Sequence, residues 1–121
     1  MQTEVGAVLI TGILQCQGGI RIEIEERLEA VRQPWLFMHW LRGEYVKLVF
    51  YRYNAVLWNR GTIFRYNSPH DDHRQFHHVH RFDVLGTGAE TVEPVAEQDV
   101  PGLRDVLREA EDWYWAHLRK G

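Results

Sequence analysis

The chain lacks the features of a membrane, secreted or disulfide-stabilised protein. Its 121 residues include a single cysteine, Cys16, so no disulfide can form within the chain. It has no run of about eighteen apolar residues, the length that a membrane-spanning helix needs. The N-terminal stretch MQTEVGAVLITG has neither a basic leader nor a long apolar segment, so no signal peptide is expected. These absences predict a cytoplasmic protein without membrane contact.

The sequence also lacks the short motifs of several well-known catalytic sites. It contains no paired-cysteine motif, no HExxH sequence, no phosphate-binding glycine loop and no nucleophile elbow. Gly86 and Gly88 are separated by one residue but open no predicted helix, so they are predicted to be turn glycines. The net charge of −3 argues against a general nucleic-acid binder.

Alternating and β-branched stretches predict an antiparallel sheet. Ile20, Ile22 and Ile24 alternate with charged residues, as in a strand buried on one face. Pro34 falls in residues 32–44, which are expected to form a loop or an edge segment. β-Branched and aromatic residues favour further strands. Strands are expected at residues 5–14, 20–29, 44–54, 62–67, 78–85 and 89–95.

The C-terminal region predicts one helix. It is expected to begin at Asp99 or Val100, with Pro101 in its first turn, and apolar residues recur at helical spacing as far as His117. The fold class is therefore α+β: an antiparallel β-sheet of five to six strands with one C-terminal helix packed on one face. The length is sufficient for one core, so residues 1–121 are expected to form a single domain.

The most unusual segment is residues 63–83, IFRYNSPHDDHRQFHHVHRFD, which holds five of the seven histidines. Histidines titrate near neutral pH, so two of them can act as base and acid, while a guanidinium stabilises a charged phosphate. Arg65 is expected to hold the phosphate, and His78 and His80 to supply base and acid. Tyr66 and His70 are expected to position the substrate. The five predicted catalytic residues are therefore Arg65, Tyr66, His70, His78 and His80.

The strand pattern raises a question about the faces of the predicted strand at 78–85. His78 and His80 share parity with Phe82 and Val84, which are expected to face the core. The histidines then either line a partly buried pocket on the inner face, or a bulge near Arg81 changes the parity.

A metal site is the second interpretation of the same segment. His78 and His80 are two residues apart and share a strand face, while His73 and His77 have the spacing of one helical turn. Asp71 and Asp72 could add oxygen ligands. Since the spacing matches no specific motif, two cofactor predictions stay open: no cofactor, or a divalent metal such as zinc at the histidine cluster.

The run IFRYNSPH, followed by HHVH, resembles the TumE-like toxins of bacterial type II toxin–antitoxin pairs. That family shows an aliphatic-Phe-Arg-Tyr-Asp-Asn-Ala-Pro-His run and then a His-His-Lys-His run. Here Asn67 stands alone before Ser68, and Val79 replaces the lysine. Carried over residue by residue, the resemblance points to Arg65, Tyr66, Asn67, Pro69, His70, His77, His78 and His80.

The leading interpretation is a toxin-like nuclease that uses His/Arg acid–base chemistry, on RNA rather than DNA. The resemblance implies a cognate antitoxin protein as partner, for which Trp35 and Trp113 are candidate contacts. A homodimer through unpaired sheet edges is also considered. The alternatives are a non-catalytic protein- or metal-binding module, and a metal-dependent hydrolase centred on the histidine cluster.

Overall fold

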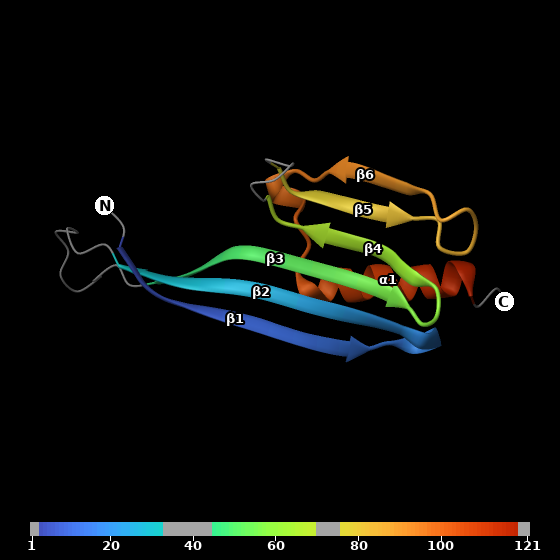
Figure 1. The fold of residues 1–121 in the computed structure, drawn as a ribbon, viewed down its shortest axis with the longest axis horizontal. Coiled ribbons are helices and arrows are strands. Elements are labelled where there is room, and N and C mark those ends of the chain that lie inside the picture. Colours follow the sequence, from blue (N-terminus) through green and yellow to red (C-terminus); the bar gives the residue numbers. More distant parts are fainter. Residues whose placement is uncertain (1–2, 33–44, 70–75, 119–121) are drawn as a thin grey trace.

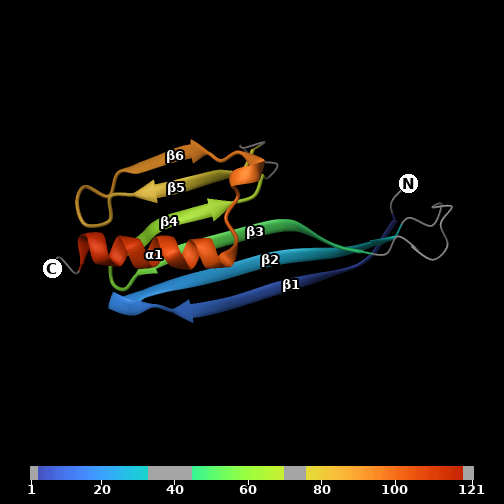
Figure 2. The same cartoon turned by 180° about the vertical axis from the view of Figure 1, so that it is seen from behind.

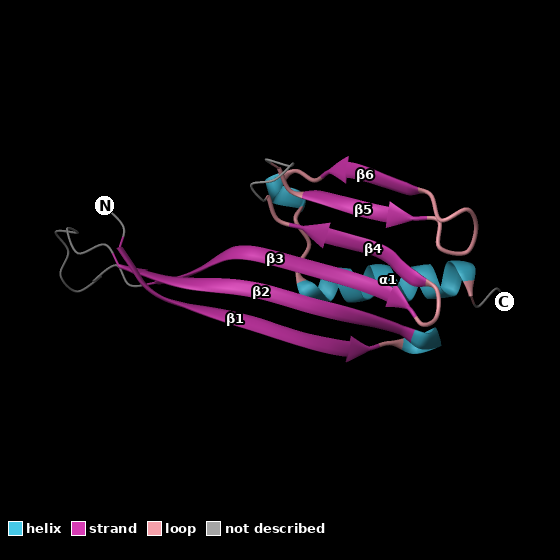
Figure 3. Ribbon diagram, viewed as in Figure 1, coloured by secondary structure: helices cyan, strands magenta, loops and turns pink. Residues whose placement is uncertain are grey.

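The protein is described by a computed structural model that covers residues 3–32, 45–69 and 76–118. Most of this described chain is strand (Figure 3). The strands form one antiparallel sheet in sequence order, a meander without crossovers. The elements are β1 (Thr3–Gln15), η1 (Gln17–Gly19), β2 (Ile20–Arg32), β3 (Tyr45–Leu57), β4 (Gly61–Asn67), β5 (His78–Phe82), β6 (Glu90–Pro94), η3 (Glu97–Asp99) and α1 (Leu103–His117).

The helix α1 lies against one face of the sheet, which we call the helix face; the opposite one is the open face (Figures 1 and 2). The first three strands are longer than the others and extend beyond the helix as a three-stranded arm (Figure 1). This confirms the predicted fold class, an antiparallel sheet with one C-terminal helix. No helix in the described part of the chain is long and apolar enough to cross a membrane.

The core lies between α1 and the helix face. Ile20 and Ile22 of β2 are fully buried, as the alternating pattern predicts, and α1 contributes Val106 and Ala110. Phe64 of β4 is 1% exposed and is among the largest fully buried side chains. Because successive strand residues point to opposite faces, the strands that build this core also present polar side chains on the open face.

The β1–β2 turn contacts the C-terminal half of α1 through a glycine. Gly18 has φ of 69°, a left-handed conformation that glycine adopts without steric cost. A Cβ atom at Gly18 would lie 2.4 Å from ring atoms of Tyr114. The β1–β2 turn is thus also a point where the hairpin packs on the helix.

The predicted start of the helix and the predicted end of the strand at 78–85 differ from the structure. The helix begins at Leu103 and not at Asp99 or Val100, because residues 97–99 form the separate turn η3. Strand β5 ends at Phe82, since the Asp83 carboxylate accepts a hydrogen bond from the Thr87 backbone N–H and closes a turn. The loop predicted at residues 32–44 lies, apart from its first residue, outside the described part of the chain.

Candidate functional site

The open face presents two rows of polar residues that cross the sheet. The first row contains residues that pair directly across neighbouring strands: Glu23, Asn54, Arg65 and His80. The second row is built in the same way from Glu25, Arg52, Asn67 and His78. Directly opposed side chains on one face lie within contact distance of each other, so strand register alone assembles this polar surface.

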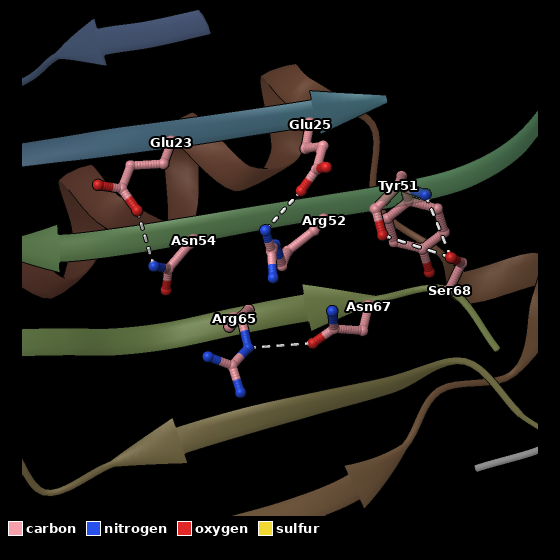
Figure 4. Close-up of polar contacts among 8 residues, drawn as sticks. All are labelled: Glu23, Glu25, Tyr51, Arg52, Asn54, Arg65, Asn67 and Ser68. Atoms are coloured by element: carbon pink, nitrogen blue, oxygen red, sulfur yellow. Dashed lines mark hydrogen bonds and ion pairs between the residues drawn. The ribbon is translucent and has the colours of Figure 1, made fainter. Parts of the chain in front are cut away.

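Hydrogen bonds join residues within each row, and one connects the two rows (Figure 4). Asn54 Nδ2 donates to Glu23 Oε1 at 3.0 Å, and Arg65 Nε donates to Asn67 Oδ1 at 3.2 Å. Arg52 Nη2 donates to Glu25 Oε1 at 2.5 Å, a charge-assisted pair between neighbouring strands. These contacts hold the side chains in fixed positions on a rigid sheet.

Arg65 differs from the other arginines of the open face. Arg21 pairs with Glu23 at 3.1 Å, Arg27 with Glu29 at 3.2 Å, and Arg52 with Glu25. Within the described residues, Arg65 makes no ion pair and donates only to the neutral amide of Asn67. A guanidinium that lacks an acidic partner retains donors for a phosphate, which it matches in geometry.

His80 pairs with a carboxylate from the next strand. Its Nδ1 lies 2.6 Å from Glu90 Oε2, at the start of β6. Because a carboxylate only accepts, Nδ1 is the donor in this contact, which leaves Nε2 as the ring nitrogen that can accept a proton. His80 is also the direct cross-strand neighbour of Arg65. The side chain is 13% exposed, so part of it reaches solvent.

His78 lies beside His80 but is almost completely buried. The two rings meet edge to face with centroids 4.9 Å apart, and His78 is 1% exposed. Its Nδ1 donates to the Phe76 carbonyl oxygen at 3.0 Å. The structure therefore makes His80 the more accessible histidine of the pair, with His78 packed against it.

The predicted orientation of the strand at 78–85 is wrong. His78, His80 and Phe82 lie on the open face, since His78 and His80 pair with the open-face residues Asn67 and Arg65. Val79 and Arg81 face the helix instead. The β4–β5 pairing runs from Phe64–Arg81 to Asn67–His78 without a register shift, so no bulge is involved. The charged Arg81 is accommodated on the helix face because Glu109 of α1 accepts its hydrogen bond.

Tyr66 lies on the opposite face from the other predicted catalytic residues that the structure describes. Its hydroxyl donates to Glu109 Oε1 at 2.6 Å, and the Arg81 guanidinium lies over its ring at 6.0 Å. The sheet thus separates Tyr66 from Arg65, His78 and His80. The expectation that Tyr66 positions the same substrate does not fit this geometry. His70 lies outside the described residues.

Of the remaining predicted metal ligands, the structure describes only His77. His77 contacts the Tyr51 hydroxyl through Nδ1 at 2.8 Å, on the helix side. Asp71, Asp72 and His73 lie outside the described residues. Among residues 3–32, 45–69 and 76–118, no three His, Cys, Asp or Glu side chains form a group that could hold a metal ion.

A hollow of 760 Å³ adjoins the polar rows on the open face. β1 forms one wall with Thr11, Gly12 and Ile13, and Arg52, Asn54 and Arg65 line the opposite side. The buried Asn54 Oδ1 has no hydrogen-bond partner among the described atoms. The hollow is therefore concave, partly apolar and bordered by hydrogen-bonding groups, as small-molecule and nucleotide sites are.

Sequence reasoning missed Glu90, Glu109 and Asn54. Glu90 orients His80, yet in the sequence it is one of several acids in a weak edge-strand pattern. Its role depends on the β5–β6 register, in which Glu90 is opposite Phe82 and diagonal to His80. Glu90 could have been identified from the sequence only by predicting the β5–β6 hairpin in this register.

The helix face contains buried tyrosines that predict a stability change at alkaline pH. Burial raises the pKa of Tyr51 and of Tyr66 from 10.0 to about 12. Tyr66 adds to the shift of Tyr51, and Glu109 adds to the shift of Tyr66. The folded state holds these protons more tightly than the unfolded chain. The stability that the two protonated tyrosines contribute is fully present below pH 10 and is lost as the pH rises toward 12.

We expect the free energy of unfolding in urea to fall steeply across this alkaline window. The Tyr51→Phe/Tyr66→Phe variant should show a shallower fall, because two ionising groups are removed. Parallel curves for the two proteins would contradict the assignment.

Comparison of the chain with known protein families, with curated proteins and with solved structures finds no match. The resemblance of residues 63–82 to TumE-like toxins therefore stays a prediction. What the structure establishes is the α+β meander fold and a polar open face.

Proposed function

We propose that the protein is a toxin-like nuclease of a toxin–antitoxin pair and that it cleaves RNA on the open face. The observation that carries the proposal is the His80–Glu90 pair beside Arg65. A carboxylate-oriented imidazole next to an arginine that lacks an ion-pair partner is the combination that phosphodiester cleavage needs. The sequence resemblance supports the toxin class.

The proposed reaction assigns one role to each group. Nε2 of His80 removes the proton from a ribose 2′-hydroxyl, whose oxygen attacks the adjacent phosphorus. Arg65 neutralises the charge that develops on the phosphate oxygens. The bond to the 5′-oxygen breaks, solvent protonates that oxygen, and a 2′,3′-cyclic phosphate remains. Glu90 stabilises the imidazolium that forms when His80 takes the proton.

This assignment differs from the one made on sequence alone. Proton transfer is given to His80, because the buried ring of His78 is not open to a substrate. His78 then supports the His80 ring by edge-to-face contact. Tyr66 has no role at the phosphate, because it lies across the sheet.

The test compares the intact chain with His80→Asn in growing cells and on purified RNA. An asparagine amide can replace Nδ1 as the donor to Glu90, but it cannot take up a proton near neutral pH. We expect His80→Asn to lose growth arrest and to lower the cleavage rate about 10²–10⁴-fold, the usual contribution of general acid–base catalysis.

His117→Asn is the matched control. His117 is an exposed histidine of α1 whose Nδ1 also makes one hydrogen bond, to the Trp113 carbonyl oxygen at 3.0 Å. It should cleave RNA like the wild type. Intact RNA with the wild-type chain would reject the nuclease and leave the non-catalytic binding module. Activity that a chelator removes and zinc restores would favour the metal-dependent hydrolase.

An antitoxin partner follows from the toxin class, and two tryptophans were expected to contact it. Trp35 lies outside the described residues. Trp113 packs against the core cluster and stacks on His117 with ring centroids 4.7 Å apart. Trp115, which is 50% exposed on the same helix, is therefore a better candidate contact than Trp113.

A further inference from the structure

The two edges of the sheet differ in their protection against strand addition. The edge strand β6 is short and contains Glu90, Glu93 and Pro94. Charges and proline on an edge strand hinder pairing with another chain. The other edge strand, β1, has thirteen residues and no charged residue from Val5 to Gln15. Its outer backbone groups form a long template for another strand.

Apolar side chains on both faces of β1 are exposed. On the helix face Val8 is 57% exposed, and on the open face Leu9 and Ile13 are 62% and 61% exposed. Val8 pairs with Leu28 of β2, which in turn pairs with Leu48 of β3, so these three residues form an aliphatic row across the arm. Leu48 is 45% exposed. Such a row of aliphatic residues at an open edge is unusual for a strand that stays unpaired in water.

We infer that β1 pairs antiparallel with β1 of a second copy, so that the two sheets become continuous. A two-fold axis at Leu9, the midpoint of β1, places residues of equal parity opposite each other, so both faces match. Val8 then lies opposite Ile10 of the second copy, which extends the aliphatic row across the axis.

The pairing chemistry points to a second copy and not to a strand of another kind. Each of β2–β6, the other strands that the structure describes, contains charged residues, whereas the only one in β1 is Glu4, next to its N-terminal end. β1 is free of charge over almost its whole length, so two copies meet without repulsion along the contact. In a closed two-fold dimer, both β1 edges are paired, and the two outer edges of the joined sheet are the charged, proline-containing β6 strands.

Pairing through β1 has a consequence for the open face. An axis perpendicular to the sheet puts both open faces on the same side. The hollow on each copy is walled by Thr11, Gly12 and Ile13 of β1, so the two hollows would flank the axis. The inference does not depend on the nuclease proposal, because it rests on the edge strand alone.

The test is the mass of the purified chain in sedimentation velocity across a dilution series. We expect the wild type to sediment as a dimer of the 14.3 kDa chain. Leu9→Lys and Leu9→Asp should each sediment as monomers, because two like charges meet at the axis. An equimolar mixture of these two variants should regain the dimer mass, since opposite charges then pair.

Two features of the chain make the test specific. Leu9 is opposite Arg27 of β2, so Leu9→Lys adds a local repulsion that Leu9→Asp does not. Loss of the dimer in both variants therefore cannot arise from that local effect. Leu85→Lys changes an exposed leucine far from β1, 42% exposed in a turn, and should remain dimeric. A monomeric wild type, or a dimer that survives both Leu9 substitutions, would overturn the inference.

Discussion

Arg65→Gln should lower the rate of RNA cleavage about 10²–10³-fold while leaving the fold intact, a cost typical of removing one donor that stabilises developing charge. Arg65 is the open-face arginine without an ion-pair partner among the described residues, so its guanidinium is free to bind a phosphate. A glutamine side chain can keep a hydrogen bond to Asn67 but brings no positive charge.

The free energy of unfolding should change by less than about 1 kcal/mol in Arg65→Gln, because the substitution affects only the hydrogen bond to the neutral Asn67 amide. The measurement pairs single-turnover cleavage with urea unfolding of the same preparation. Arg108→Gln, which makes the same chemical change at an exposed position of α1, should retain full activity. Equal losses in the two variants would show that overall charge matters and not the Arg65 site.

Arg65→Lys separates charge from geometry. Lysine keeps the positive charge but loses the planar fork that binds two phosphate oxygens at once. If Arg65 contacts the phosphate in this way, the lysine variant should cleave faster than Arg65→Gln and slower than the wild type. Wild-type activity would indicate that a point charge at this position is sufficient.

The sheet and the helix were predictable because their signals are local. Ile20, Ile22 and Ile24 show the period of two, and Leu103 to His117 show the helical period, each within one stretch of chain. The start of α1 was predicted too early because a proline after acidic residues is common in a first helical turn, whereas Asp105 here accepts the Gly102 N–H and starts the helix later.

The candidate site was only partly predictable, because it depends on register between strands. The sequence grouped Arg65, Tyr66, His78 and His80 by proximity along the chain. The register then placed Tyr66 on the helix face and added Glu90 from β6 to His80. The face of β5 was misjudged because Arg81 looks like a surface residue in the sequence. Glu109, twenty-eight positions further along the chain, is what allows it to face the helix.

Strand β4 connects the core to the site through adjacent residues. Phe64 and Tyr66 point into the core, while Arg65 and Asn67 lie on the open face. The buried pair meets edge to face with ring centroids 5.7 Å apart, and Ser68 accepts a hydrogen bond from the Tyr51 backbone N–H at 3.1 Å beyond the strand end (Figure 4). The position of Arg65 is thus set by core packing on either side of it.

Phe64→Ala should lower the free energy of unfolding by about 3–5 kcal/mol, the usual cost of removing a fully buried phenylalanine. The 1% exposed ring would leave a cavity between β4 and α1, and Tyr66 would lose its edge-to-face partner. Urea unfolding measures the loss, and Leu85→Ala, at an exposed leucine, should cost less than about 1 kcal/mol.

The neighbouring substitutions in β4 should then give opposite results. Phe64→Ala should lose stability, and under conditions where it remains folded it should keep most of the cleavage activity, because no group on the open face is removed. Arg65→Gln should lose activity and keep its stability. If Phe64→Ala, shown to be folded by circular dichroism, is as inactive as Arg65→Gln, then the activity depends on the packing of β4 as a whole and the open-face assignment must be abandoned. If Phe64→Ala has the same free energy of unfolding in urea as the wild type, the core does not lie where β4 meets α1.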